Sequence, residues 1–294
     1  MTTNDLAIET THLTKRYGRR TVLDSVSLRV PKGTVFAFLG ANGAGKTTTI
    51  HILLDILDRT SGQAKVLGLD CARQSLEIKR RIGFVAEGQS MYDWMKIDEI
   101  IRFCRGFYSD WDDSLAQDMK HRYDLPGSSR VGELSRGMRG KLALLLAMSH
   151  RPELLILDEP TSGLDVIVRH DFLKGVVEVI QEGGRTVFFS THQVNEVERI
   201  ADWVGIIDQG KLVWCSSMED LKNSVKRIVL SFESTRPIPT DVPNLLRLEN
   251  RGRQISMTVN KVSPETMAAI HALRPTDMVV EDLSLERILV DMVG

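Results

Sequence analysis

Residues 40–47 read Gly-Ala-Asn-Gly-Ala-Gly-Lys-Thr, which matches the pattern G-x-x-x-x-G-K-[ST] of a phosphate-binding P-loop. The octet follows the apolar segment 34–39, which the sequence predicts as a buried strand. It precedes residues 47–57, whose isoleucine and leucines recur at helical spacing. Strand, loop and helix in this order are the context that confirms the motif. The expected nucleotide contacts are Gly40, Asn42, Gly43, Gly45, Lys46, Thr47 and Thr48.

The residue types of this octet suit a polyphosphate. Its glycines let consecutive backbone N–H groups curl around phosphate oxygens without Cβ clashes. Lys46 would supply a mobile positive charge for the β- and γ-phosphates, and the Thr47 hydroxyl is the expected Mg²⁺ ligand. The octet therefore predicts a site for a nucleoside triphosphate, with Lys46 also a candidate catalytic residue.

Composition limits the size, partners and setting of the chain. Its 294 residues suggest one large or two unequal domains. The hydrophobic fraction of 42% is ample for a buried core. The 38 basic and 39 acidic residues balance, so nothing in the charge calls for nucleic acid as a partner. The three cysteines lack metal-ligand spacing and are expected to be reduced thiols. No apolar run approaches the ~20 residues of a membrane helix, and no signal peptide is recognisable, so we expect no transmembrane segment.

A second motif places two carboxylates at the end of an apolar strand. Residues 154–160 read Leu-Leu-Ile-Leu-Asp-Glu-Pro, the pattern of a Walker B strand, whose aspartate (Asp158) positions Mg²⁺ directly or through water. Glu159 would then act as general base on the attacking water. Acidic strand ends are common at protein surfaces, but this one follows the P-loop by 112 positions (Lys46 to Asp158), which favours the functional interpretation.

A third motif, Leu-Ser-Arg-Gly-Met at 134–138, opens a predicted helix over 139–149. Ser135 and Gly137 would lie at its N-terminus, where exposed amides and the helix dipole favour a phosphate. A serine that merely caps the helix is the alternative. The position of the motif, 23 residues before Asp158, is what makes it recognisable.

Strands and helices alternate around these motifs, which predicts an α/β fold with a mainly parallel sheet and helices on both faces. The mostly helical stretch at about 90–150 is expected to be an insertion into that core. The composition changes near residue 225. We therefore expect a large first domain at 1–224 and a small α+β accessory domain at 225–294.

The order and spacing of the motifs resemble the nucleotide-binding subunit of an ABC transporter. The family's Walker A, Q-loop, signature, Walker B, D-loop and switch histidine correspond to 40–47, a site near Glu87, 134–138, 154–159, 162–165 and 190–192. The resemblance covers about residues 6–220 and implies a P-loop NTPase core of the ABC ATPase kind. It also implies that Tyr17 stacks on adenine, that Asp165 belongs to the nucleotide site, and that His192 contacts the γ-phosphate and holds the catalytic geometry.

The resemblance further implies partners. Two such subunits pair head to tail, with each ATP between the P-loop of one and the signature helix of the other. ATP and Mg²⁺ are the implied cofactors, and a homodimer or heterodimer on the cytoplasmic face of the cell membrane is the implied assembly. An integral-membrane permease would dock on 90–125, with 91–95 and Trp94 as candidates.

Three positions depart from the family pattern. Glu87 stands at the Q-loop glutamine, where a carboxylate would still bind Mg²⁺ but adds negative charge near phosphates; Gln89 is the alternative placement. Arg136 stands where the family usually has Gly, and Met138 where it has Gln. We hypothesise that Arg136 adds positive charge near the nucleotide of the second subunit.

The accessory domain and the ending at 284–289 resemble bacterial ATPases of ABC-2-type exporters, and 91–95 and 107–111 resemble a subgroup linked to drug or peptide efflux. We therefore expect ATP hydrolysis that powers a separate permease for export of a drug, peptide or related small molecule. The alternative is a soluble ABC-type ATPase with a regulatory or sensor role. The single cassette, the lack of heptads and the near-zero net charge disfavour action on ribosomes or DNA, and the intact Glu159 and His192 disfavour a binding-only sensor.

Overall fold

The computed structural model describes residues 5–88, 90–181, 184–235 and 242–293. The chain divides into two compact units, Met1–Cys215 and Ser216–Gly294. The division lies before the expected boundary at 224/225, because helix α8 (Met218–Ser224) packs against strand β12 (Val225–Ser231) and so belongs to the second unit.

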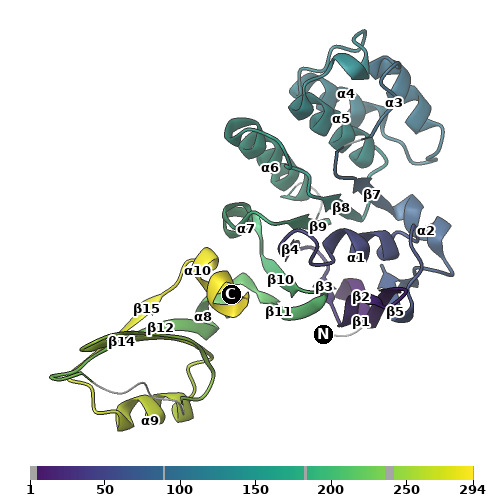
Figure 1. The fold of residues 1–294 in the computed structure, drawn as a ribbon. Helices are drawn as coiled ribbons and strands as arrows, with labels where there is room; N and C mark the ends of the chain where they lie inside the picture. The colour runs from purple at the N-terminus through teal and green to yellow at the C-terminus, as the bar shows by residue number, and fades with distance from the viewer. Residues whose placement is uncertain (1–4, 89, 182–183, 236–241, 294) are drawn as a thin grey trace. The chain divides into compact units, whose positions relative to one another are not determined.

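A six-stranded sheet with the order β11-β10-β4-β9-β8-β7 forms the centre of the first unit (Figure 1). Its strands are β4 (Val35–Leu39), β7 (Ile82–Val85), β8 (Leu154–Asp158), β9 (Thr186–Thr191), β10 (Trp203–Asp208) and β11 (Lys211–Ser217). The pairs from β10 to β7 are all parallel, which confirms the predicted α/β class. Because parallel strands end at one edge, the P-loop after β4, the carboxylates at the end of β8 and His192 after β9 meet there.

A second, antiparallel sheet covers helix α1 (Lys46–Leu53) on the side away from the parallel sheet. Its strands are β1 (Leu6–Tyr17), β2 (Arg20–Val26), β3 (Arg29–Pro31), β5 (Ser61–Val66) and β6 (Leu69–Asp70). Ile50 of α1 shares one buried core with Ile8 of β1 and Phe188 of β9. On this side a second sheet encloses the helix, a layer that the sequence analysis did not predict. The expected helix over 47–57 also ends early, at Leu53.

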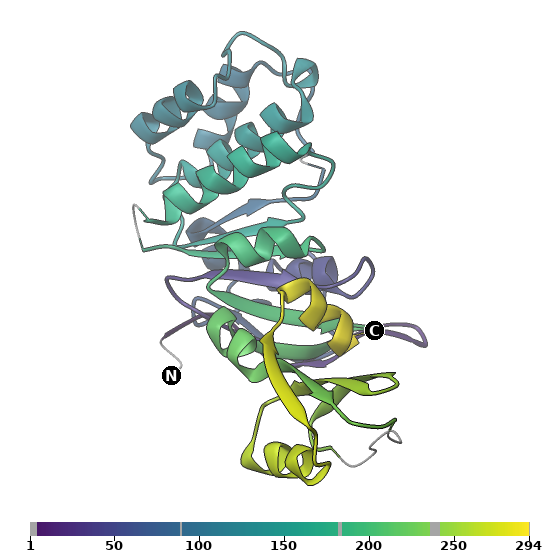
Figure 2. The ribbon, with the colours of Figure 1, turned by 90° about the vertical axis from the view of Figure 1, so that its left-hand side faces the viewer.

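The helical insertion lies at one end of this unit, as Figures 1 and 2 show. After α2 (Ser75–Arg81), it contains α3 (Ile97–Arg105), α4 (Asp113–Arg122), a 3₁₀ turn (Val131–Glu133) and α5 (Arg136–Met148). The chain then returns to the sheet and adds α6 (Val166–Gln181) and α7 (Val194–Ile200). Within the described ranges, no helix is both long and apolar enough to cross a membrane.

The second unit is a four-stranded antiparallel sheet with the order β13-β14-β12-β15. Its remaining elements are β13 (Leu245–Arg251), β14 (Gln254–Asn260), β15 (Asp277–Asp282), α9 (Pro264–Ala272) and α10 (Leu285–Val293). Ile228, Leu230 and Met257 form an apolar core with Ile270 of α9 on one sheet face. Strand residues between them point to the opposite face, which is polar. This is the small α+β architecture that the sequence predicts.

Helix α5 lies directly on β7, and Gly83 makes this contact possible. A Cβ at Gly83 would lie 2.3 Å from the Ala147 carbonyl oxygen and 3.0 Å from Leu155 Cδ1. The first of these atoms belongs to helix backbone, so it cannot move without displacing α5. The close approach therefore fixes α5, whose N-terminus carries the signature motif.

We expect Gly83→Ala to destabilise the first unit by about 1–3 kcal/mol, because overpacking a close contact forces backbone shifts. Gly106→Ala is the matched control: its Cβ would meet only Phe103 O, at 3.3 Å, and we expect a change within about 1 kcal/mol. All four tryptophans lie in Met1–Cys215, so tryptophan fluorescence during urea unfolding reports on this unit. Equal midpoints for the two variants would contradict the packing argument.

Candidate functional site

A cavity of about 560 Å³ lies at the carboxyl edge of the parallel sheet. Its volume falls within the roughly 300–1,000 Å³ of small-molecule sites. The lining residues are Tyr17, Arg20, Val22, Asn42, Gly43, Gly45, Lys46, Thr47, Thr48, Glu87, Glu159, Ser162 and His192. All of these except Arg20 and Val22 belong to residues or motifs that the sequence analysis selected. Segments far apart in the chain thus supply one site.

The P-loop presents the N-terminus of α1 to this cavity. Gly45 caps the helix with φ 114°, a conformation that favours glycine, and no side chain caps the first turn. The first backbone N–H groups of α1 therefore stay available for an anion. Gly40 does not line the cavity, but its carbonyl oxygen accepts a hydrogen bond from Lys46 Nζ at 2.7 Å.

Lys46, Glu159 and His192 form a chain of polar contacts. Lys46 Nζ lies 3.0 Å from Glu159 Oε1, and His192 Nδ1 lies 2.9 Å from Glu159 Oε2. The side chains of Lys46 and Glu159 are only 5% and 6% exposed, whereas His192 is 40% exposed. The structure thus joins the three predicted catalytic residues through the two oxygens of one carboxylate.

Thr47 and Asp158, the predicted Mg²⁺ ligands, are hydrogen-bonded to each other. Thr47 Oγ1 donates to Asp158 Oδ1 at 3.2 Å. Ser190 Oγ donates to the same carboxylate oxygen at 2.6 Å and accepts from the Glu159 backbone N–H at 3.0 Å. Buried Ser190 therefore fixes both carboxylate residues, a role that the sequence analysis missed although the residue precedes the switch histidine by two positions.

The third predicted Mg²⁺ ligand, Glu87, lines the same cavity with an exposed side chain. The structure does not bring its carboxylate into hydrogen bonding with Thr47 or Asp158. Its alternative, Gln89, lies outside the described residues. Of the three predicted Mg²⁺ ligands, Thr47 and Asp158 are thus in contact with each other, and Glu87 lines the same cavity without bonding to them.

A buried glutamate holds the loops on either side of the site together. Glu196 Oε1 accepts from Thr161 Oγ1 at 2.8 Å, and Oε2 accepts from Thr191 Oγ1 at 3.1 Å. Arg169 Nε lies 3.3 Å from Glu196 Oε1. Burial raises the pKa of Glu196 above its usual value, against the lowering effect of these donors. Glu196, which no sequence motif indicated, thus connects the segment after Glu159 to the residue before His192.

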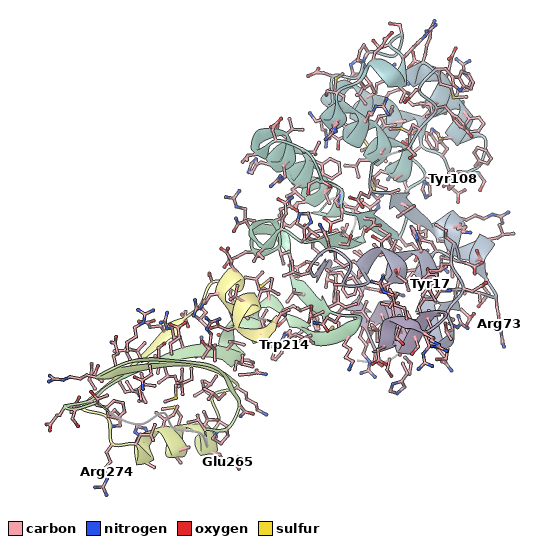
Figure 3. The ribbon with its side chains drawn as sticks, in the orientation of Figure 1. Tyr17, Arg73, Tyr108, Trp214, Glu265 and Arg274 are labelled. Atoms are coloured by element: carbon pink, nitrogen blue, oxygen red, sulfur yellow. The ribbon has the colours of Figure 1, made fainter. Side chains whose placement is uncertain are left out.

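Tyr17 lies at the end of β1, at the rim of the cavity (Figure 3). Its ring is 51% exposed, and Lys15 Nζ lies 4.9 Å from the ring centroid. The ammonium occupies one face by a cation–π contact, and the exposed remainder of the ring suits stacking on a base. Arg20 pairs with Tyr17 across the β1–β2 hairpin and places a cation beside it. A single surface arginine has no sequence signature, so it was missed.

Ser135, Gly137 and Asp165 do not line this cavity. Ser135 Oγ accepts from the Met138 backbone N–H at 3.2 Å, so the serine caps α5. Gly137 is buried against Val168, and Asp165 Oδ1 accepts from the Val168 backbone N–H at 3.0 Å at the start of α6. Within one chain, Ser135 and Asp165 therefore cap helices, and Gly137 lies in the contact between α5 and α6.

Arg136 is exposed at the first position of α5. Its Nη1 lies beside Gly163, 2.8 Å from where a Cβ would stand. A cation at a helix N-terminus opposes the helix dipole, and the first turn of α5 contains no acidic residue. An anion from outside the chain would relieve this opposition.

Known proteins match this site in sequence and fold. Residues 23–162 match the ABC transporter family. Over 228 residues the chain is 37% identical to the bacitracin transport ATP-binding protein BcrA of Bacillus licheniformis, covering 77% of this chain and 74% of that protein. The chain belongs to the ABC transporter family.

Two further comparisons support this assignment. The chain is 32% identical over 302 residues to the daunorubicin resistance ATP-binding protein DrrA2 of Streptomyces coeruleorubidus, covering 96% of this chain and 91% of that protein. A solved ATP binding subunit of an ABC transporter shares its fold with a TM-score of 0.67 and 26% identity, covering 74% of this chain and 92% of the other. The predictions of an ABC ATPase fold, of ATP binding and of ATP hydrolysis for transport are confirmed.

We expect Ser190→Ala to lower kcat for ATP by about tenfold or more, because a hydrogen bond to a charged group contributes about 1.5–3 kcal/mol. KM for ATP should change less, since Ser190 does not line the cavity. Ser149→Ala is the control: Ser149 is equally buried, but its hydroxyl donates to Leu145 O of the same helix rather than to a residue of the site. Steady-state ATPase assays measure both constants, and equal kcat in the two variants would refute the positioning role.

Proposed function

We propose that this ATPase powers export of a drug or peptide-like molecule through a separate membrane permease. The names of BcrA and DrrA2, which refer to bacitracin transport and daunorubicin resistance, support this cargo class. The observation that carries the catalytic part is the contact of Glu159 with both Lys46 and His192 beside the Thr47–Asp158 pair.

In this proposal the triphosphate replaces Glu159 as the counter-ion of Lys46. The buried Lys46–Glu159 pair satisfies two charges that would be costly to leave alone. When Lys46 turns to the phosphates, Glu159 Oε1 becomes free to accept a proton from water. His192 holds the other oxygen and so orients the carboxylate. Binding of the nucleotide therefore also frees the carboxylate of Glu159 to act as the general base.

Thr47 and Asp158 are the residues that would hold Mg²⁺. Their hydroxyl and carboxylate oxygens are ligands that Mg²⁺ prefers, and substrate phosphates commonly complete its shell. Among the residues that the structure describes, no group of three or more His, Cys, Asp and Glu could hold a metal alone, which agrees with a site that needs the nucleotide. When bound, the ion neutralises charge on the phosphates.

The second half of each site would come from another subunit, either a second copy or a related chain. Ser135, Gly137 and Asp165 lie outside the cavity of their own chain. The exposed N-terminal turn of α5, with Arg136, offers an anion-binding surface to a nucleotide held elsewhere. A head-to-tail pair gives this turn its ligand.

The permease would dock on an apolar cavity of about 570 Å³ next to an aromatic cluster. Trp94, Tyr92, Phe103 and Phe107 form this aromatic cluster, with successive ring centroids 6.0, 5.9 and 5.1 Å apart. Their rings are 43–67% exposed, and exposed apolar groups of this size mark interaction sites. The cluster includes part of the region that the sequence analysis selected.

A short segment connects the docking cavity to the nucleotide cavity. Glu87 lines the nucleotide cavity, whereas Ala86, Ser90 and Met91 line the apolar one. A shift of this segment on nucleotide binding would therefore reach a docked permease directly.

We expect Glu159→Gln to reduce ATP hydrolysis by about 100-fold or more while ATP still binds, because general base catalysis contributes about 10²–10⁴-fold. Glu153→Gln at the opposite end of β8 is the control, since Glu153 pairs with Arg81 on the surface, away from the nucleotide cavity. ATPase assays and equilibrium nucleotide binding, with and without the permease, measure the two effects. Full activity of Glu159→Gln would remove the assigned base.

We expect the double variant Trp94→Ala and Phe107→Ala to weaken binding of the permease by about tenfold or more, as for hot-spot aromatics. Basal ATPase activity should not change, because neither side chain lines the nucleotide cavity. Leu76→Ala is the control: Leu76 is 77% exposed on α2 and lines neither cavity. Co-purification from membranes and permease-stimulated ATPase activity test the docking surface, and unchanged stimulation in the double variant would exclude it.

A further inference from the structure

A small polar cavity of about 180 Å³ lies on the polar sheet face of the second unit. Every strand of the sheet contributes to it: Arg227 and Val229 from β12, Arg251 from β13, Gln254 and Ser256 from β14, and Glu281 from β15. Strand alternation explains this grouping, because the residues in between, such as Ile228 and Ile255, point into the apolar core. The cavity is thus part of the regular sheet.

The guanidinium of Arg227 makes few hydrogen bonds to the described residues around it. Its side chain is only 25% exposed, and Nε donates to Ser256 Oγ at 2.6 Å. Its two carboxylate neighbours, Glu249 and Glu281, are each 4.0 Å away, beyond hydrogen-bonding distance. A guanidinium has five N–H donors, and among the described residues the one hydrogen bond of the Arg227 side chain is that to Ser256. The remaining donors of this partly exposed guanidinium are therefore available to a ligand in the cavity.

One of these two carboxylates, Glu249, is bound by other arginines. Arg287 donates to Glu249 at 2.6 Å, and this contact, with Arg247 and Arg251 nearby, lowers the pKa of Glu249 below its usual value. Arg251 itself lies 3.2 Å from Glu249 and is 71% exposed, so it can turn toward the cavity. Arg227 and Arg251 are the two cations that line the cavity and can face an anion there.

We propose that this cavity binds a phosphate group, either as the free ion or as a small soluble monoester. Two guanidiniums, the Ser256 hydroxyl and the Gln254 amide surround a space of suitable size, and forked guanidinium donors match phosphate oxygens. Glu281 competes for Arg227, so it limits the affinity. The site is separate from the ATP cavity and does not depend on the proposed export function.

The test is a calorimetric titration of the full chain with inorganic phosphate, with ADP present at saturation to occupy the P-loop. We expect saturable binding, weakened about tenfold or more in Arg227→Gln and in Arg251→Gln, since each loses a charge-assisted hydrogen bond. Glu281→Gln should bind phosphate more tightly. Arg253→Gln is the matched control, because Arg253 is exposed on the same hairpin and does not line the cavity.

Titration with glycerol 3-phosphate and with phosphatidic acid vesicles identifies the form of the ligand. Binding of the soluble compounds supports the proposal, and binding of vesicles alone would overturn it. No saturable binding by the wild type, or an unchanged affinity in both arginine variants, would also overturn it. Exposed Arg251 keeps the test decisive even if replacing Arg227 disturbs the sheet.

Discussion

The ion pair between Lys46 and Glu159 joins the two halves of the catalytic machinery. One residue begins the helix after β4, and the other follows β8, two strands away across β9. A buried pair of this kind strongly penalises loss of either partner, because an uncompensated charge would remain. In the proposed function, a bound triphosphate would separate the pair at low cost, since its phosphates would offer Lys46 a new counter-charge. One exchange of partners would then link nucleotide binding to release of the proposed base.

The contacts around this pair make the exchange specific. Ser190 bonds both Asp158 and the Glu159 backbone, and Glu196 bonds the threonines before His192 and after Glu159. Because Ser190 and Glu196 are buried and bonded in this way, they would hold the carboxylates at the end of β8 in place during the proposed exchange. His192, which is 40% exposed, is the least enclosed member of the chain of contacts.

The sequence predicted those parts of the site that depend on local backbone. Residues 40–47 and 154–160 fix loop and strand-end conformations by themselves, so their positions followed from spacing. Ser190, Glu196 and Arg20 act through side chains from distant strands and helices, and such contacts have no local pattern. The end of α1 at Leu53 and the sheet that encloses this helix were missed for the same reason: apolar spacing shows that a face is buried but does not show what covers it.

The charge balance of the cavity supports the proposal that a second subunit contributes to each site. Arg20 and Lys46 line the cavity with two positive formal charges, and Glu87 and Glu159 line it with two negative ones, so the formal charges of these four residues cancel. A polyanion entering this cavity therefore meets helix amides and a balanced set of side chains rather than an excess of cations. The glutamate at position 87 creates this balance, because a glutamine there would leave one net positive charge. Arg136, at the start of α5, has no ion-pair partner among the residues that the structure describes, and in the proposed pair it would face the nucleotide of the second subunit. The departures at 87 and 136 would then compensate each other, because Glu87 adds a negative charge on the P-loop side and Arg136 would add a positive charge from the facing subunit.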